Sequence, residues 1–233
     1  METLNAAWGL MTGFDPALTG IVGLSMRVSL SAVFLGLLIG SPLGAALAIW
    51  DFHGKQALVV LSNSMMALPP VVVGLGVYVL LSRAGPLGQF GLLFTPPAMI
   101  IAQTILIIPI IMALTREAVI PLRRDYNDLM ISLDVKPLLK LRTLLWDARF
   151  GVVTAVLAGF GRAIAEVGAV LIVGGNINGL TRVMTTTIAL ETSKGNLALA
   201  LALGVVLIAL AILVNTVIYY VGQFGRRYQE AAR

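Results

Sequence analysis

The chain has 233 residues, of which 58% are hydrophobic and 12% are charged, and its mean hydropathy is +0.96. Soluble domains carry about 25% charged residues, so this composition indicates an integral membrane protein and excludes an ordinary soluble enzyme. The sequence has no cysteine and one histidine, which excludes disulfides and thiolate chemistry and disfavours a metal site. We interpret the net charge of +5 as a property of membrane loops rather than a nucleic-acid-binding surface.

Five segments are long and apolar enough to cross a bilayer as helices, because a hydrocarbon core of about 30 Å needs roughly 20 apolar residues. They are residues 28–50, 57–81, 91–115, 151–175 and 197–221. A sixth segment, residues 181–190, is too short to cross, which predicts a re-entrant or interfacial helix. The sequence therefore predicts an all-α integral membrane protein with about five transmembrane helices and one short additional helix.

Glycine and proline mark special positions in these spans. Gly36, Gly40 and Gly44 recur every four residues, which predicts a close contact with another helix. Each proline removes a backbone donor, so it marks either a packing kink or a broken helix of the kind that lines translocation paths. These prolines are Pro42, Pro69, Pro70, Pro96, Pro97 and Pro109.

The longest polar stretch, residues 116–149, holds 12 of the 27 charged residues. It predicts a short helix over residues 125–133, a break at Pro137 and then an amphipathic helix. The apolar face of that second helix is predicted to contain Leu138, Leu141 and Leu145. Either this loop meets a partner protein, or it is a solvated basic loop that fixes the topology.

The distribution of Lys and Arg predicts the orientation of the chain. If residues 116–149 are cytoplasmic, eleven of these cations lie on the inner side and four on the outer side. That asymmetry satisfies the positive-inside rule. We therefore expect a multi-pass protein of a bacterial or archaeal cytoplasmic membrane, with its N-terminus outside and its C-terminus inside.

The loop resembles the coupling loop of the transmembrane subunits of binding-protein-dependent ABC importers. That family has a Glu-Ala-Ala, glycine and Ile-x-Leu-Pro pattern, which aligns here with residues 128–130, Asp134, Leu144 and residues 146–147. Of that pattern, only the acidic head and the apolar spacing are retained. The resemblance implies that the ATPase-coupling residues are Asp128, Met130, Ser132, Leu133, Asp134, Val135 and Lys136.

Two further segments, residues 67–88 and 161–195, are similar to molybdate and tungstate permeases. The second contains Ala-Ile-Ala-Glu-Val-Gly and Gly-Gly-Asn-Ile, and its Met-Thr-Thr-Thr and Glu-Thr-Ser-Lys-Gly stretches favour the tungstate branch. The resemblance implies a type I ABC importer permease fold that forms the oxyanion path as a homodimer. It also implies two copies of a cytoplasmic ABC ATPase subunit and an extracytoplasmic oxyanion-binding protein as partners, besides membrane lipid.

No GxxxxGK[ST] phosphate-binding loop is present in the sequence, so we expect ATP and Mg to be used by the partner ATPase and no cofactor or metal to be bound by this chain. No enzymatic activity of its own is expected. We expect one permease domain over residues 1–233, with the coupling loop at 116–149 and an outer gate or re-entrant segment at 174–195.

Charged and polar residues inside the spans are candidates for the path or its gate. Arg162 and Glu166 are four residues apart and are expected to pair, either as a buried ion pair that fixes one helix or as part of a gate. Residues 174–187 are rich in amide and hydroxyl donors, which suit an oxyanion but equally suit a local turn. The candidates are Asn63, Ser64, Arg162, Glu166, Asn176, Asn178, Thr181, Arg182, Thr185, Thr186 and Thr187.

Two alternatives remain open at this point: a permease for another oxyanion such as sulfate, and a stand-alone secondary transporter. A secondary transporter predicts inverted repeats and ion ligands near the middle of the membrane.

Overall fold

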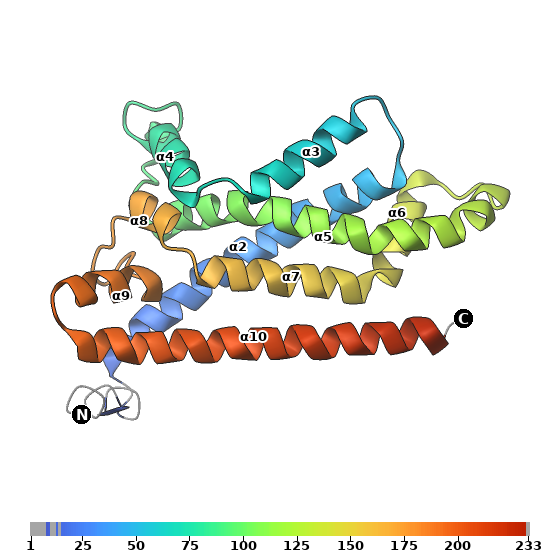
Figure 1. Cartoon of the computed structure of the whole chain (residues 1–233). Coiled ribbons are helices and arrows are strands. Elements are labelled where there is room, and N and C mark those ends of the chain that lie inside the picture. The colour runs from blue at the N-terminus through green and yellow to red at the C-terminus, as the bar shows by residue number, and fades with distance from the viewer. Residues whose placement is uncertain (1–7, 10–12, 14, 232–233) are drawn as a thin grey trace. The chain divides into compact units, whose positions relative to one another are not determined.

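The computed structural model describes residues 8–9, 13 and 15–231, and these residues form helices with no strand among them (Figure 1). The predicted all-α class is confirmed. The α-helices are α2 (Pro16–Ile49), α3 (Lys55–Met66), α4 (Pro70–Leu81), α5 (Pro96–Ser132), α6 (Pro137–Asp147), α7 (Arg149–Ile164), α8 (Gly168–Gly174), α9 (Met184–Ser193) and α10 (Leu197–Ala231), and η1 (Gly88–Phe90) is a 3-10 helix.

Three helices, α2, α5 and α10, are each long and apolar enough to cross a membrane. Two pairs, α3 with α4 and α6 with α7, meet the same criterion together and bend by 100° and 72° at their breaks. If each bent pair is one span, the described chain has five, which agrees with the predicted number. The most apolar part of α10 is 22% buried, against 56% for α2 and α5.

The bend between α3 and α4 lies at the predicted Pro-Pro pair. Pro69 has an extended conformation, with φ −61° and ψ 123°, and Pro70 begins α4. A residue before proline is pushed out of the helical region, and proline itself fits the first position of a helix, where its missing N–H leaves no bond unmade. The two prolines therefore end one helix and start the next.

Three predicted boundaries are wrong. Helix α5 continues to Ser132, so residues 125–133 are its C-terminal part rather than a separate helix. The chain becomes polar near residue 116, but the helix does not end there, because the following Arg, Leu, Met and Glu residues still favour a helix. The predicted span 151–175 is broken at residues 165–167, and the short helix α9 begins at Met184 instead of residue 181.

The chain forms two compact units. Unit 1 contains residues 1–32, 69–104 and 161–213, and unit 2 contains residues 33–68, 105–160 and 214–233. Helices α2, α5, α7 and α10 each contribute residues to both units. That the whole chain acts as a single permease domain stays a prediction.

In unit 2, the glycine face of α2 packs closely against α5, as predicted. A Cβ atom at Gly36 would lie 2.9 Å from Ile107 Cγ2, and one at Gly40 would lie 3.0 Å from the backbone oxygen of Ile108. A Cβ at Gly44 would overlap the backbone of Met112. The next turns of α2 and α5 belong to a buried apolar cluster that fixes the position of α6. Its buried members are Ala45, Ala48, Ile49, Val119, Met130, Leu144 and Ala148.

In unit 1, helix α8 packs against α4. Gly74 of α4 faces Ala169 of α8 so closely that a Cβ on Gly74 would lie 2.7 Å from Ala169 Cα. The N–H of Phe94 donates to the backbone oxygen of Val173 at 2.9 Å, which joins the connection after η1 to α8. Gly175 ends α8 with φ +69°, a left-handed conformation that favours glycine. These contacts hold the broken part of the predicted span 151–175 in place.

Candidate functional site

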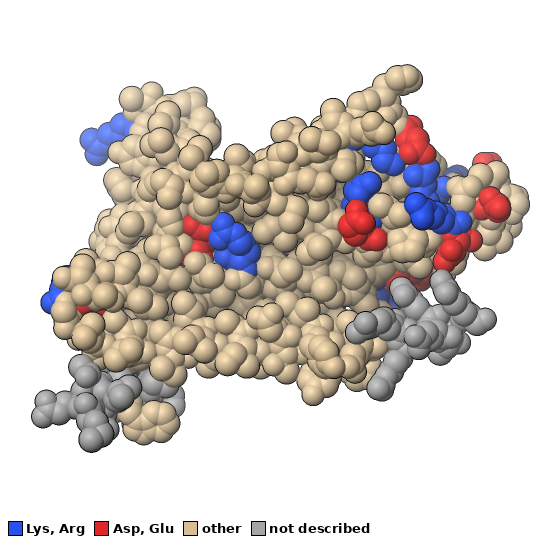
Figure 2. All heavy atoms as spheres, viewed as in Figure 1, with Lys and Arg blue, Asp and Glu red and all other residues tan. Residues whose placement is uncertain are grey.

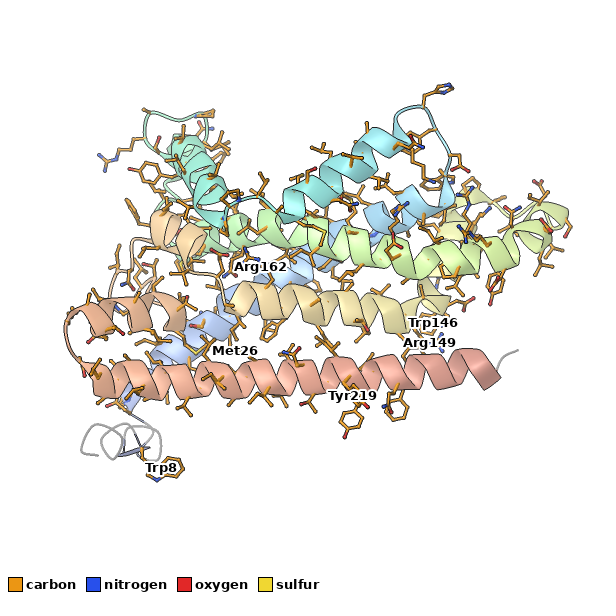
Figure 3. All side chains as sticks on the ribbon, in the orientation of Figure 1. Trp8, Met26, Trp146, Arg149, Arg162 and Tyr219 are labelled. Carbon is orange, nitrogen blue, oxygen red and sulfur yellow. The ribbon has the colours of Figure 1, made fainter. Side chains whose placement is uncertain are left out.

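The break between α7 and α8 contains the predicted ion pair. Arg162 Nη1 lies 2.7 Å from Glu166 Oε2, and the side chain of Glu166 is 3% exposed, whereas that of Arg162 is 35% exposed. Arg162 lies at the C-terminal end of α7 (Figure 3), and Glu166 follows the end of that helix, so the two residues do not pair within one continuous helix as predicted. The other carboxylate oxygen of Glu166 accepts a hydrogen bond from the N–H of Ala169 at 3.1 Å. Glu166 therefore joins the end of α7 to the first turn of α8.

Two polar side chains satisfy backbone carbonyl groups at this break. The amide of Gln103 donates to the backbone oxygen of Ala163 at 3.1 Å, and the hydroxyl of Thr185 donates to the backbone oxygen of Glu166 at 2.7 Å. Non-helical backbone at membrane depth is tolerated only where protein groups or water supply such partners. The break is therefore stabilised by specific hydrogen bonds from Gln103 and Thr185.

A small hollow of about 10 Å³ adjoins the ion pair, with Ser29, Gln103 and Glu166 among the residues that line it. Gln103 Oε1 is buried and has no hydrogen-bond partner among the described residues. The volume is close to that of a single water molecule, so the cavity is too small for a tetrahedral oxyanion. The sequence did not indicate Gln103 strongly, because an isolated amide in a span is equally suited to joining two helices.

The threonines after α8 are buried and bonded to the protein itself. Thr181 donates to the backbone oxygen of Gly174, and Thr187 donates to that of Val183 at 2.7 Å. Thr186 donates to Asn176 Oδ1 at 2.9 Å. With the bond from Thr185 described above, every predicted threonine has a protein partner, which is the arrangement that the local-turn alternative predicts.

The remaining candidates in this region are more accessible. Asn178 is exposed in the turn between α8 and α9, where Gly179 has φ +73°. Arg182 is half-buried, and its Nε atom has no hydrogen-bond partner among the described residues. Asn63 and Ser64 are exposed on α3, which belongs to unit 2, whereas the other path candidates belong to unit 1.

The turn between α5 and α6 contains the predicted coupling residues. The N–H of Asp134 donates to the backbone oxygen of Ile131, and the N–H of Val135 donates to that of Met130, each at 3.1 Å. Asp134 has φ +48°, so these bonds and this conformation form a left-handed C-terminal cap of α5. Asp134 aligns with the glycine of the family pattern, and glycine favours this same conformation.

The coupling candidates divide into buried and exposed residues. Met130 is buried in the unit 2 cluster and Val135 packs against that cluster, so both support the turn from inside. Leu133 is 66% exposed, and two residues that were not among the predicted coupling residues, Leu129 and Ile131, are 58% and 67% exposed. Leu129 and Leu133 are four residues apart, a helical spacing that would have indicated a shared face. The other candidates, Asp128, Ser132, Asp134 and Lys136, are exposed.

Helix α6 has the predicted apolar face, and only part of that face is buried. Leu141 and Leu145 pack against the unit 2 cluster together with the fully buried Leu144. Leu138 lines one hollow together with Leu141 and Leu145, in keeping with the predicted apolar face, but Leu138 itself is exposed. Leu138 lies at the first turn of α6, just after the cap at Lys136, where the helix has not yet reached the cluster.

The fold that these elements form is that of a transmembrane subunit of an ABC transporter. A solved structure of the MetNI methionine ABC transporter in inward-facing conformations contains a chain with this fold, with a TM-score of 0.63 and 16% identity, over 93% of this chain and 96% of that chain. At this identity the likeness concerns the fold alone. No model of a known protein family matches the chain.

Relatives found by sequence similarity identify the family of transporter permeases to which the chain belongs. A probable anion ABC transporter permease protein of Haloferax volcanii is 45% identical over 85% of this chain and 88% of its own length. A tungstate uptake system permease protein, TupB, of Peptoclostridium acidaminophilum is 39% identical over 94% and 96%. A molybdenum transport system permease protein, ModB, of Mycobacterium tuberculosis is 27% identical over 87% and 79%. The chain belongs to the family of ABC transporter permeases that contains the tungstate and molybdate permeases.

Proposed function

We propose that this chain is the membrane subunit of an ATP-driven importer for tungstate, with molybdate as the nearest alternative substrate, and that two copies form the translocation path. The observation that carries the choice of substrate is the 39% identity, over nearly the full length of both chains, to a permease named for tungstate uptake. The relative named for molybdenum transport is more distant, at 27% identity.

In this proposal the energy comes from a separate cytoplasmic ATPase that binds the turn between α5 and α6. Exposed apolar side chains surrounded by charged residues are typical of a surface that another protein covers. Leu129, Ile131 and Leu133 form such a group beside Asp128 and Asp134. This end of unit 2 is then cytoplasmic, which also places the N-terminus outside and the C-terminus inside. An extracytoplasmic binding protein delivers the anion to the opposite side.

The proposed contact for the anion in the path is the accessible part of the Arg162 guanidinium. Arginine has five N–H donors, and one of its terminal nitrogen atoms is engaged with Glu166. Glu166 holds the guanidinium in place, while its own negative charge would repel a dianion in a medium of low dielectric constant. Other accessible donors could contact the anion elsewhere along the path, namely Asn63, Ser64, Asn178 and Arg182. The predicted threonines, which are bonded to the protein itself, stabilise the structure around the path.

Uptake into proteoliposomes tests the proposal. The permease is reconstituted with its ATPase and binding protein, and tungstate uptake is measured with ATP inside the vesicles, with an ATPase variant unable to hydrolyse ATP as the control. We expect uptake that requires ATP, the active ATPase and the binding protein. Concentrative uptake by the permease alone on an ion gradient would instead support a secondary transporter, and a strong preference for sulfate over tungstate would support a different oxyanion permease.

A further inference from the structure

The charged end of unit 2 contains a pocket that shares only Asp128 with the proposed ATPase contact. It has a volume of about 500 Å³ and lies between the C-terminal end of α2, the start of α3 and the polar part of α5. Figure 2 shows basic and acidic side chains gathered at this end. The charged and amide side chains that line the pocket are Lys55, Arg116, Arg123, Arg124, Asn127 and Asp128.

Two of these cations are already held by the protein. Lys55 Nζ lies 2.9 Å from Asp51 Oδ1, and Arg123 binds the other oxygen of Asp51. Arg123 Nη1 also donates to the backbone oxygen of Ala48 at 2.8 Å, near the C-terminal end of α2. A cation at a helix C-terminus is stabilised by the partial negative charge of the last carbonyl groups. Arg123 and Lys55 therefore form a fixed positive wall of the pocket. Both carboxylate oxygens of Asp51 bind these two cations.

The other two cations have donors to spare. Arg116 Nη1 lies 2.6 Å from Glu117 Oε1, but its Nε atom is buried and has no hydrogen-bond partner among the described residues. Arg124 is exposed, and within the described chain it has no hydrogen-bond or ion-pair partner. Four cations and one carboxylate, Asp128, line the pocket, and Asp51 and Glu117 pair with three of these cations. The pocket retains both a positive charge and free guanidinium donors.

An apolar wall continues from this pocket. A second hollow of about 460 Å³ shares Lys55 and Arg116 with the first and extends along α3 past Val59 and Val60. Val60 is exposed where it lines this hollow, and Leu58 and Leu61 are exposed elsewhere on α3. Cationic donors next to an exposed apolar helix face match a molecule with an anionic head and an apolar tail. Such basic pockets at the end of membrane helices bind anionic lipid head groups.

We propose that Arg116, Arg124 and Lys55 bind the phosphate of an anionic phospholipid whose acyl chain lies along α3. The recognised chemistry is a tetrahedral oxyanion group, bound by guanidinium and ammonium donors. A free oxyanion in solution would offer the same group without the apolar tail, and the α3 wall is the reason that we assign a lipid. This inference requires that the chain lies in a membrane, but it does not depend on the transported substrate.

Native mass spectrometry of the full-length chain in detergent tests the proposal. Phosphatidylglycerol, phosphatidylcholine with the same acyl chains, and inorganic phosphate are titrated separately against the protein. We expect tighter binding of phosphatidylglycerol than of phosphatidylcholine. The variant Arg116→Gln/Arg124→Gln should weaken phosphatidylglycerol binding by about twenty-five-fold, because each basic residue near a lipid surface contributes roughly fivefold. The matched control Lys136→Gln/Arg142→Gln removes two exposed cations of the same polar region that do not line the pocket, and it should change binding less than twofold.

A second variant distinguishes a loss of lipid binding from a loss of folding. Arg124→Gln alone breaks no bond within the described chain, so it should fold normally and weaken phosphatidylglycerol binding by roughly fivefold. Equal binding of the two lipids, or equal losses in the pocket and control variants, would overturn the proposal. Inorganic phosphate that binds the pocket and displaces phosphatidylglycerol at equal concentration would overturn the assignment to a lipid in favour of a soluble oxyanion. Transport of tungstate is not measured, so failure here leaves the proposed function unaffected.

Discussion

The guanidinium of Arg162 lies 2.7 Å from the carboxylate of Glu166 across the point where helix α7 has ended. The two partners differ in exposure, with Glu166 almost completely buried and Arg162 about one-third exposed. Breaking a buried pair is destabilising because the remaining charge lacks a partner, and the penalty is larger for the more buried partner. The consequences of removing either residue should therefore be unequal.

We expect Arg162→Gln to lower the free energy of unfolding by about 3–5 kcal/mol, because it leaves the buried carboxylate of Glu166 unpaired. Glu166→Gln should lower it by less, since the side chain of Arg162 reaches an accessible surface. The double variant should be more stable than Arg162→Gln alone. Thermal unfolding of the three purified variants measures this order, and equal, additive losses would contradict the assigned pairing.

The left-handed conformation of Asp134 predicts an unusual response to glycine. Asp134→Gly should raise the free energy of unfolding by about 0.5–1 kcal/mol, because glycine adopts a positive φ without steric penalty. Asp134→Val should lower it by about 1–2 kcal/mol, since a β-branched residue is disfavoured there. Asp128→Gly, in the body of α5, is the matched control and should lower it by about 0.5–1 kcal/mol. Unfolding by heat or denaturant measures all three, and destabilisation by both glycine variants would exclude the proposed cap.

The proposed ATPase contact can be separated from the folding of the turn. Ile131→Asp/Leu133→Asp changes two exposed side chains, so the permease should remain folded but should no longer copurify with its ATPase. Leu180→Asp changes an exposed leucine of unit 1 that is outside the proposed contact, and it should leave copurification unchanged. Undiminished ATPase binding by the first variant would remove the turn from the proposed interface. A substitution at Val135 is unsuitable, because this residue packs against the unit 2 cluster and its loss would disturb the fold.

The close contact between α2 and α5 predicts that Gly44→Ala is destabilising. The added methyl group would overlap the backbone of Met112, and overpacking of this kind costs about 1–3 kcal/mol. Gly23→Ala is the control in the same helix, where a Cβ meets nothing within 4 Å. That change should stabilise the helix by about 0.5–1 kcal/mol. Thermal unfolding compares the two, and a neutral Gly44→Ala would show that the helices separate easily at this point.

The pH dependence of Asp51 follows from its two cations. The Arg123 guanidinium and the Lys55 ammonium hydrogen-bond to Asp51 and hold the pKa of its carboxyl well below its usual range. A group with a lowered folded-state pKa contributes stability above its unfolded-state pKa of about 4 and loses that contribution as the pH falls toward the folded-state value. The difference in Tm between the natural chain and Asp51→Asn should therefore be constant between pH 7 and pH 5 and should decrease only below about pH 4. A difference that already declines between pH 7 and pH 5 would argue against this network.

The sequence predicted those features that single residues determine. The Pro69–Pro70 pair identified the bend before α4, and the four-residue spacing of Gly36, Gly40 and Gly44 identified the packed face of α2. The spacing of Arg162 and Glu166 identified their ion pair. Each of these patterns acts through local geometry, so it is readable without knowledge of the tertiary structure.

Other features depend on partners that are distant in the sequence. The break at residues 165–167 follows no proline, and it is held by hydrogen bonds from Gln103 and Thr185, which are far away in the chain. The end of α5 is set by the cap at Asp134 rather than by the onset of polar residues. Which leucines of α6 are buried depends on where the cluster of α2 and α5 lies, so periodicity predicted the apolar face but not which of its leucines would be exposed.

Helix α10 leaves most of its apolar surface without a partner among the described residues, since only 22% of its most apolar part is buried. Leu, Ile and Val should therefore exchange freely along it in a saturation mutagenesis screen, whereas charged residues should be rejected at nearly every position. In α5, where 56% is buried, the size of the side chain should also be selected. The two helices would then show different tolerance profiles, one governed by solubility in hydrocarbon and the other by shape.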